Sequence, residues 1–170
     1  IGGIVLSYIW LMIFNSCLAH FSKTIVSTQW YAFWGLIIVV CWQQIGYMMI
    51  IYIAGIQNIP GELIEAAKID GANAWQLLKN VTLPMLMPTI TICSFLTLTN
   101  GFKLFDQNLA LTGGNPGKLS ELLALNIYDT MYGMTGWQGV GQAKAVIFFI
   151  LVAVIAIVQN KLTTSKEVTD

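Results

Sequence analysis

Long runs without a charged residue divide this chain into apolar segments separated by polar connections. Three of these runs lie between charged residues, at 24–61, 80–102 and 145–160. A membrane-spanning helix needs about 20 mostly apolar residues, so each run can hold one span. The apolar opening of the chain predicts another. The pattern therefore predicts an all-α, polytopic membrane helical bundle with about four spans, at about residues 1–14, 31–56, 85–102 and 143–159.

The composition agrees with a membrane protein. Hydrophobic residues make up 56% of the chain and charged residues only 9%, and the mean hydropathy is +0.72. The net charge is zero and arginine is absent, which argues against nucleic acid as a partner. Three cysteines, Cys17, Cys41 and Cys93, lack paired spacing, so neither a disulfide framework nor a metal site is expected. The chain opens on Ile1, and we expect residues 1–170 to be a fragment of a single transmembrane domain.

A polar stretch, residues 58–84, separates the second and third expected spans. Pro60 suits the first turn of a helix, and carboxylates follow it near the positive end of the helix dipole. Gly71 can adopt the left-handed backbone that ends a helix. Asn73 and Gln76 have the spacing of a capping box for a second helix. The stretch therefore predicts a compact helical hairpin.

Two expected spans carry polar and aromatic groups at mid-membrane depth. The second span contains Trp42, Gln43, Gln44 and Tyr47, and the third is rich in threonine, including Thr97. Buried amides in hydrocarbon are costly without partners. One interpretation is that they join neighbouring helices, with Gly46 permitting a close approach. The other is a solute path, in which aromatic faces and amides contact a polar ligand.

The longest polar connection, residues 103–142, has glycine-rich turns on either side of an amphipathic piece, Leu119 to Tyr132. Residues 113–120 superficially resemble a nucleotide-binding P-loop. Their spacing is one residue short, and Leu119 stands where a magnesium ligand is required, so we expect no ATP site. The lone His20 is expected to be solvated. Four lysines fall on each side of the membrane, so charge alone does not orient the chain.

The hairpin also carries a recognisable motif. Glu65-Ala66-Ala67, then Gly71, Val81 and Leu83-Pro84, resembles the EAA loop of binding-protein-dependent ABC importer permeases, with valine in place of the more usual isoleucine. The segments 54–60 and 111–116 are similar to those of the sugar-uptake branch, the maltose and multiple-sugar permeases. That branch usually has Leu-Thr-Gly-Gly-Gly-Pro in the second segment, so Asn115 departs from it.

This resemblance implies a type I ABC importer permease in the cell membrane. Its partners would be cytoplasmic ABC ATPase subunits, a second permease subunit in a heterodimer and an external solute-binding protein that delivers a sugar. The chain itself would be neither an enzyme nor a cofactor-binding protein. The hairpin would be the cytoplasmic coupling loop, and residues 103–142 would be extracytoplasmic. The resemblance assigns ATPase coupling to Leu63, Ile64, Glu65, Ala66, Ala67, Asp70 and Gly71.

Matched residue by residue to the maltose permease, Trp42, Gln43, Gln44 and Tyr47 fall on sugar-site positions, and Thr97 replaces a site serine. Trp42 and Tyr47 match in kind, whereas the two glutamines do not. Gly101 and Leu104 stand where that protein has asparagines. The resemblance further assigns binding-protein contact to Thr112, Gly113, Gly114, Asn115 and Pro116.

The sequence also allows functions other than sugar import. A permease for a non-sugar solute and a purely structural helical scaffold both remain open. A membrane enzyme or a proton-coupled carrier would require ionisable groups within the spans, and no Asp, Glu, His or Lys lies in the interior of the expected spans.

Overall fold

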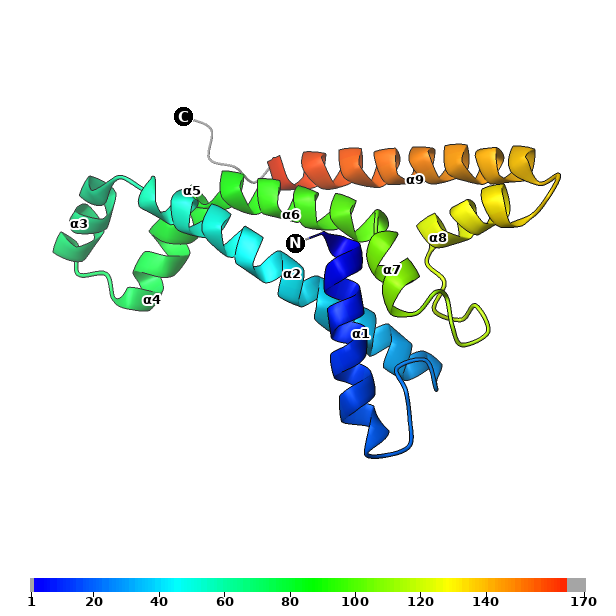
Figure 1. Ribbon diagram of the computed structural model, residues 1–170. Coiled ribbons are helices and arrows are strands. Elements are labelled where there is room, and N and C mark those ends of the chain that lie inside the picture. The colour runs from blue at the N-terminus through cyan, green and yellow to red at the C-terminus, as the bar shows by residue number, and fades with distance from the viewer. Residues whose placement is uncertain (1, 165–170) are drawn as a thin grey trace. The chain divides into compact units, whose positions relative to one another are not determined.

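A computed structural model describes residues 2–164, and these residues contain helices and connections but no strand. The all-α prediction is confirmed (Figure 1). The helices are α1 (Gly3–Ala19), α2 (Gln29–Gln57), α3 (Gly61–Ile69), α4 (Ala74–Leu77), α5 (Leu83–Met85), α6 (Met87–Phe102), α7 (Asp106–Leu111), α8 (Leu123–Tyr128) and α9 (Gln138–Thr164). Two π-helical turns accompany them, η1 (Leu78–Thr82) and η2 (Asp129–Gly133).

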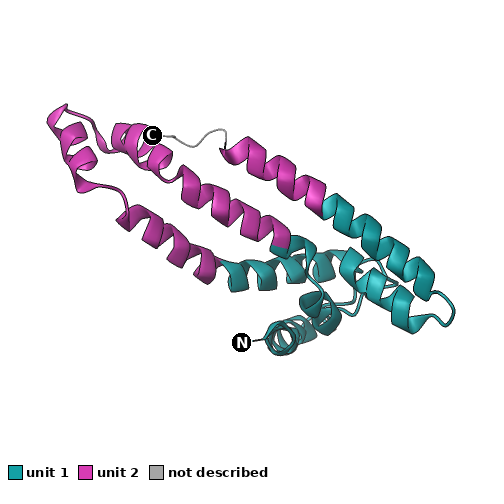
Figure 2. Cartoon of the chain, turned by 90° about the horizontal axis from the view of Figure 1, so that it is seen from above, with its two compact units in different colours: residues 1–44, 100–152 teal, residues 45–99, 153–170 magenta. Residues whose placement is uncertain are grey.

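The chain forms two compact units, which are coloured separately in Figure 2. Unit 1 consists of Ile1–Gln44 and Asn100–Val152, and unit 2 of Ile45–Thr99 and Ala153–Asp170. The long helices α2 and α9 each contribute residues to both units.

The core of unit 1 lies where α1 packs against α7 and against the first half of α2. Leu6, Leu36, Val39 and Leu111 form a buried cluster, and partly buried aromatic and aliphatic side chains of α1 extend it. Burying such side chains contributes about 1.5–3 kcal/mol each to stability. Unit 1 is therefore held by apolar contacts between segments that are far apart in the sequence.

In unit 2, α2 and α6 approach closely at Gly55. A Cβ placed on this glycine would meet the Thr89 side chain, lying 2.9 Å from its Cγ2 and 3.0 Å from its Cβ. At Gly46, in contrast, a Cβ would have no neighbour within 4 Å. Close approach of α2 and α6 is thus permitted by Gly55, and the helix-joining interpretation of Gly46 finds no neighbouring helix among the described residues.

Two helices of the described chain, α2 and α9, are long and apolar enough to cross a membrane. A third candidate exists if Ala74–Met85 and Met87–Phe102 count as one span, with a bend of 65° between them. The expected first span corresponds to α1, an apolar helix of 17 residues that continues to Ala19 and so exceeds the expected end near residue 14. In the most apolar 18-residue stretch of each helix, only 17% of α2 and 6% of α9 is buried, so both helices expose apolar side chains.

The helix that holds the expected last span, α9, starts at Gln138, before the expected start near residue 143, and takes in two glycines of the supposed turn. Gly141 explains the difference. It is buried, and a Cβ there would lie 3.1 Å from the backbone nitrogen and Cα of Met131. The glycine therefore serves close packing of α9 on η2 instead of ending the helix. The connection 103–142 correspondingly holds α7, α8, η2 and the first residues of α9.

Candidate functional site

The predicted hairpin is present in unit 2 as α3, a turn and α4 (Figure 1). Pro60 is the N-cap residue of α3, and Glu62 lies in its first turn. Gly71 has φ of +80°, in the left-handed region that disfavours residues with a Cβ. Asn73 Oδ1 accepts from the Gln76 amide at 2.9 Å, and Gln76 Oε1 accepts from the Asn73 amide at 2.8 Å. The helix start, the turn glycine and the capping box are all confirmed.

The hairpin leaves its apolar side chains uncovered. No residue of α3 or α4 is buried. Leu63 is exposed, and so are Ile69 and Trp75, at 86% and 70% of their maximal area. Sequence reasoning missed the last two, although an isoleucine and a tryptophan on either side of a polar turn were a visible signal. Large apolar side chains exposed together on a small element are typical of a docking surface.

The predicted coupling residues share this surface. Glu65 and Ala66 are exposed, while Ile64 and Ala67 are half-buried. The Asp70 amide makes the last helical bond of α3, to the carbonyl oxygen of Ala66 at 3.0 Å, and the Gly71 amide then donates to that of Lys68 at 3.1 Å. No hydrogen bond or ion pair of the Glu65 carboxylate occurs among residues 2–164, so the carboxylate is open to solvent in the described chain.

In unit 1, two of the predicted solute-path residues contact neighbouring helices. The Trp42 ring lies edge-on to the ring of Trp10 with centroids 6.0 Å apart. Gln43 Oε1 accepts a hydrogen bond from Gln107 Nε2 at 2.8 Å. One amide oxygen of the expected polar pair is therefore engaged in joining α2 to α7, as the helix-joining interpretation requires.

In unit 2, Thr97 lines a groove of about 300 Å³ between α2 and α6. Tyr52 and Ser94 also line it, so three hydroxyl groups face one space. Sequence reasoning did not assign these two residues to the site, because helical periodicity alone does not say which faces of two helices meet. The predicted Tyr47 lies on an exposed part of α2 and does not line the groove. The other lining residues are Met48, Cys93 and Leu98.

Not all hydroxyls of α6 are available to a ligand. Thr91 Oγ1 donates to the carbonyl oxygen of Met87 at 3.0 Å, and Thr99 Oγ1 donates to that of Phe95 at 2.8 Å. Such bonds return the hydroxyl to its own helix. Ser94 and Thr97 make no side-chain hydrogen bond to another described residue, which separates them from the backbone-bonded threonines.

The predicted binding-protein segment follows α7 in unit 1 and is built around buried Asn108. The Asn108 Nδ2 donates to Thr112 Oγ1 at 2.9 Å and to the Ser120 carbonyl at 2.8 Å, while its Oδ1 accepts from the Leu122 amide at 2.8 Å. The Ser120 hydroxyl donates to the carbonyl of Asn115. The loop is thus tied back to α7 at several points.

These ties divide the predicted contact residues into two groups. Thr112 is buried at 4% exposure and Gly114 is also buried, so they support the loop and cannot present a surface. Gly113 and Asn115 are exposed and Pro116 is half-buried, following a cis peptide bond. Leu119, the first residue of the amphipathic piece, is exposed at 62% and follows them in the chain.

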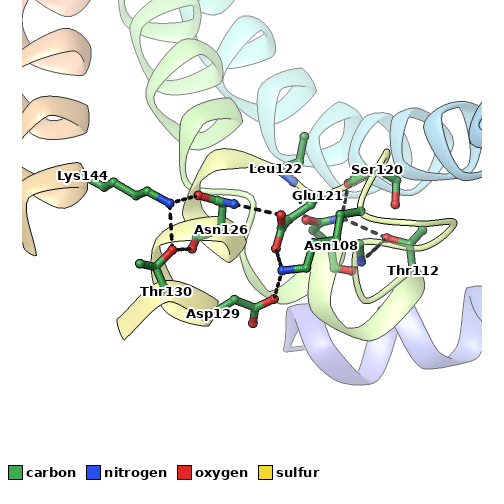
Figure 3. A network of polar contacts seen from close by, with 11 residues as sticks. Asn108, Thr112, Ser120, Glu121, Leu122, Asn126, Asp129, Thr130 and Lys144 are labelled. Atoms are coloured by element: carbon green, nitrogen blue, oxygen red, sulfur yellow. Dashed lines mark hydrogen bonds and ion pairs between the residues drawn. The ribbon is translucent and has the colours of Figure 1, made fainter. Parts of the chain in front are cut away.

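A charged network continues from the loop (Figure 3). Lys118 Nζ lies 3.3 Å from Glu121 Oε1 and 3.6 Å from Asp129 Oδ2. Glu121 is only 6% exposed, and its Oε2 accepts from Asn126 Nδ2 at 2.9 Å. Burial favours a raised pKa for Glu121, but hydrogen bonding, with Asn126 foremost, and the charge of Lys118 outweigh it, so the pKa lies below its usual value. The hydrogen bond to Glu121 and the negative charge of that carboxylate raise the pKa of Lys118.

Among the described residues, no group of three His, Cys, Asp or Glu side chains has the arrangement of a metal site. The P-loop-like segment likewise uses its lysine elsewhere, because the Lys118 ammonium is engaged with carboxylates of the same loop.

Comparison with known proteins finds a family of transport proteins and individual permeases that resemble this chain. The model of the family described as "Binding-protein-dependent transport system inner membrane component" matches residues 3–166. The chain is 49% identical to the probable starch degradation products transport system permease protein AmyD of Thermoanaerobacterium thermosulfurigenes, over 99% of this chain and 60% of that protein. It is 37% identical to the multiple sugar-binding transport system permease protein MsmF of Streptococcus mutans, over 78% of this chain and 45% of the relative. It therefore spans about three-fifths or less of the length of these relatives.

Among solved structures, the fold is similar to a chain from a bacterial ABC transporter involved in import of the acidic polysaccharide alginate. The TM-score is 0.82 with 19% sequence identity, and the match covers 97% of this chain and 61% of the other.

Proposed function

Because the chain belongs to the family of binding-protein-dependent transport system inner membrane components, we propose that it is the membrane-spanning part of an ABC importer permease. An external solute-binding protein delivers the solute, and two cytoplasmic ATPases drive alternating access. The observation that carries this proposal is the preformed hairpin, which exposes Leu63, Ile69 and Trp75 around a turn fixed by Gly71.

The hairpin is proposed as the coupling element. A short helix seated in a groove of each ATPase can transmit rigid-body movement of the ATPases to the membrane helices. Leu63, Ile64, Ala66 and Ala67 provide the apolar contact, and Gly71 sets the angle between α3 and α4. Asp70 ends α3 at the turn. Glu65, which has no partner among the described residues, is placed to bond groups of the ATPase or of neighbouring permease segments.

The solute is proposed to be a sugar, and specifically an oligosaccharide of the kind produced by starch degradation. The names of the relatives AmyD and MsmF support this, since the first is a permease for starch degradation products and the second for multiple sugars. The groove beside Thr97 supports it independently, because hydroxyl groups beside apolar walls suit a ligand with many hydroxyls.

The proposed solute path includes all five predicted residues, and their roles differ: Trp42, Gln43, Gln44, Tyr47 and Thr97. Thr97, with Tyr52 and Ser94, is proposed to contact the solute directly. Gln43 has its oxygen bonded to Gln107, so it is proposed to hold α7 and to offer only its amide hydrogens.

The proposed topology has four spans, namely α1, α2, the bent pair ending in α6, and α9. It places the hairpin in the cytoplasm and residues 103–142 outside. The apolar outer faces of α2 and α9 are proposed to contact lipid and a second permease subunit in a heterodimer. Gln159 supports the second contact, because it is a polar residue in a mostly apolar groove lined by α6 and α9.

The test is uptake of radiolabelled maltotriose by cells that carry the full-length permease and its partners. Gly71→Val places a β-branched residue at φ +80°, at a cost of about 1–2 kcal/mol to the turn. We expect normal membrane insertion, lost ATPase binding and lost uptake. Gly61→Val is the matched control in the same hairpin, since a Cβ there meets nothing within 4 Å and its φ is not positive. Full uptake by Gly71→Val, or equal loss in both variants, would refute the coupling role.

A further inference from the structure

Lys144 joins the beginning of α9 to the segment that precedes it. Its ammonium donates to Asn126 Oδ1 at 2.8 Å and to Thr130 Oγ1 at 2.8 Å (Figure 3). Both acceptors are neutral, and the half-buried lysine has no carboxylate within ion-pair distance in the described chain. A charge withdrawn from water is favourable only when hydrogen bonds replace its hydration, so these two bonds fix the position of the side chain.

The second link runs from α8 to the loop. Asn126, which accepts from Lys144, donates its own Nδ2 to Glu121 Oε2 at 2.9 Å. The other Glu121 oxygen accepts from Lys118 at 3.3 Å. Because Glu121 is nearly buried and ionised, its bonds are charge-assisted and stronger than neutral ones. The amide of Asn126 is therefore oriented by a lysine on one side and a carboxylate on the other.

The third link reaches the exposed residues of the loop. Glu121 packs against Gly114, where an added Cβ would lie 3.2 Å from the Cβ of Glu121. Its neighbour Ser120 donates to the carbonyl of Asn115. The exposed tip at Asn115 thus lies one side chain away from Glu121, and a continuous chain of contacts leads from this tip to α9. All of its members belong to unit 1.

We infer that Lys144 is a positioning residue that couples the outer loop to α9, so that a protein docked on the loop and the membrane helix influence one another through Asn126 and Glu121. The inference rests on the proposed function, which supplies the docked partner. Packing alone would not need a charged group here, because an apolar side chain would fill the same space without losing hydration. A lysine with two defined acceptors instead fixes one arrangement of the loop relative to α9.

The test uses the full-length transporter, assembled with its ATPases in vesicles, and its cognate solute-binding protein loaded with maltotriose. ATPase activity is measured per assembled complex without the binding protein and over a range of its concentrations. We expect Lys144→Gln to leave basal activity unchanged and to raise the half-stimulating concentration at least about fivefold, the lower range of allosteric coupling. Lys144→Arg keeps the charge and donors and is expected to restore most of the stimulation.

Lys103→Gln is the matched control, since this lysine is exposed beside α6 and makes no side-chain hydrogen bond among the described residues. An unchanged half-stimulating concentration in Lys144→Gln would overturn the inference, as would a proportional loss of basal and stimulated activity. If Lys144→Gln does not assemble, Glu121→Gln, an isosteric change at the middle link, is judged by the same criteria. Failure of both to assemble would show a purely structural network and also overturn it. A wild-type complex that neither responds to the binding protein nor takes up maltotriose would instead refute the proposed function.

Discussion

The close approach of α2 and α6 at Gly55 makes a quantitative prediction. An alanine Cβ at this position would meet Thr89 Oγ1 and lie 2.9 Å from Cγ2 and 3.0 Å from Cβ, distances that require the helices to move. Rotating the threonine does not relieve the contact, because both branches and the Cβ itself are too close. Overpacking of this kind costs about 1–3 kcal/mol.

The matched variant is Gly46→Ala on the same helix, where the new methyl group meets no atom within 4 Å. Replacing a helical glycine by alanine contributes about 0.8–1 kcal/mol in either position, because the unfolded chain loses freedom. The propensity gain therefore cancels between the two variants. Gly55→Ala should be less stable than Gly46→Ala by about 1–3 kcal/mol, which is the cost of overpacking alone.

The assay is denaturant unfolding of the full-length protein in detergent micelles, followed by circular dichroism. A double-mutant cycle with Thr89→Ala isolates the contact, since this change removes two of the three clashing atoms. We expect Thr89→Ala to recover most of the loss caused by Gly55→Ala and to have no effect on Gly46→Ala. Equal stabilities of the two glycine variants would show that α2 and α6 do not pack here.

Three further predictions concern the candidate site and the loop. Gln43→Ala should reduce assembly, because it leaves the Gln107 amide unpaired at a cost of about 1–3 kcal/mol. Thr97→Ala should instead assemble normally and lower the apparent affinity for maltotriose about five- to a hundredfold. Uptake kinetics normalised to membrane protein distinguish the two effects, and unchanged affinity in Thr97→Ala would exclude Thr97 from the solute path. A cysteine at exposed Asn115 should cross-link to the solute-binding protein from outside, and labelling from the cytoplasmic side would instead reverse the topology. Because the folded-state pKa of Glu121 is lowered, its contribution to loop stability is present above the ordinary carboxyl pKa of about 4.3 and is lost as pH falls through the folded value. Hydrogen exchange of residues 112–122 should show this acid sensitivity in wild type and not in Glu121→Gln, with Lys118, Asp129 and Lys144 as the neighbouring charges.

Local signals predicted the hairpin well. Pro60, Gly71 and the Asn73 to Gln76 capping box each act within one turn of the chain, so sequence spacing fixes their geometry. The apolar runs likewise predicted the helices, because hydrocarbon requires every backbone group to be bonded within its own segment.

Contacts between distant segments were beyond local reasoning. The Gln43 to Gln107 bond joins residues 64 positions apart, and no spacing rule connects them. Gly141 was expected to mark a turn, yet its lack of a side chain serves packing against Met131 within a helix start. The motif assigned Thr112 to an exposed surface, but its hydroxyl accepts a hydrogen bond from Asn108 and the residue is buried inside the loop. In each case the partner side chain decides the role, and the partner is known only from the fold.

The bend at Leu86 gives the hairpin arm the geometry of a lever. The arm from Ala74 to Met85 meets α6 at 65°, and Leu86 at the junction is only 7% exposed. At a rise of about 1.5 Å per residue the arm is about 18 Å long, so a rotation of about 10° at the junction moves its far end by about 3 Å. The reverse also holds, since a displacement of the far end of the arm by about 3 Å turns α6 by about 10° if the junction is stiff and by less if it yields. The packing around the buried Leu86 therefore determines how much of the hairpin's movement is transmitted to α6.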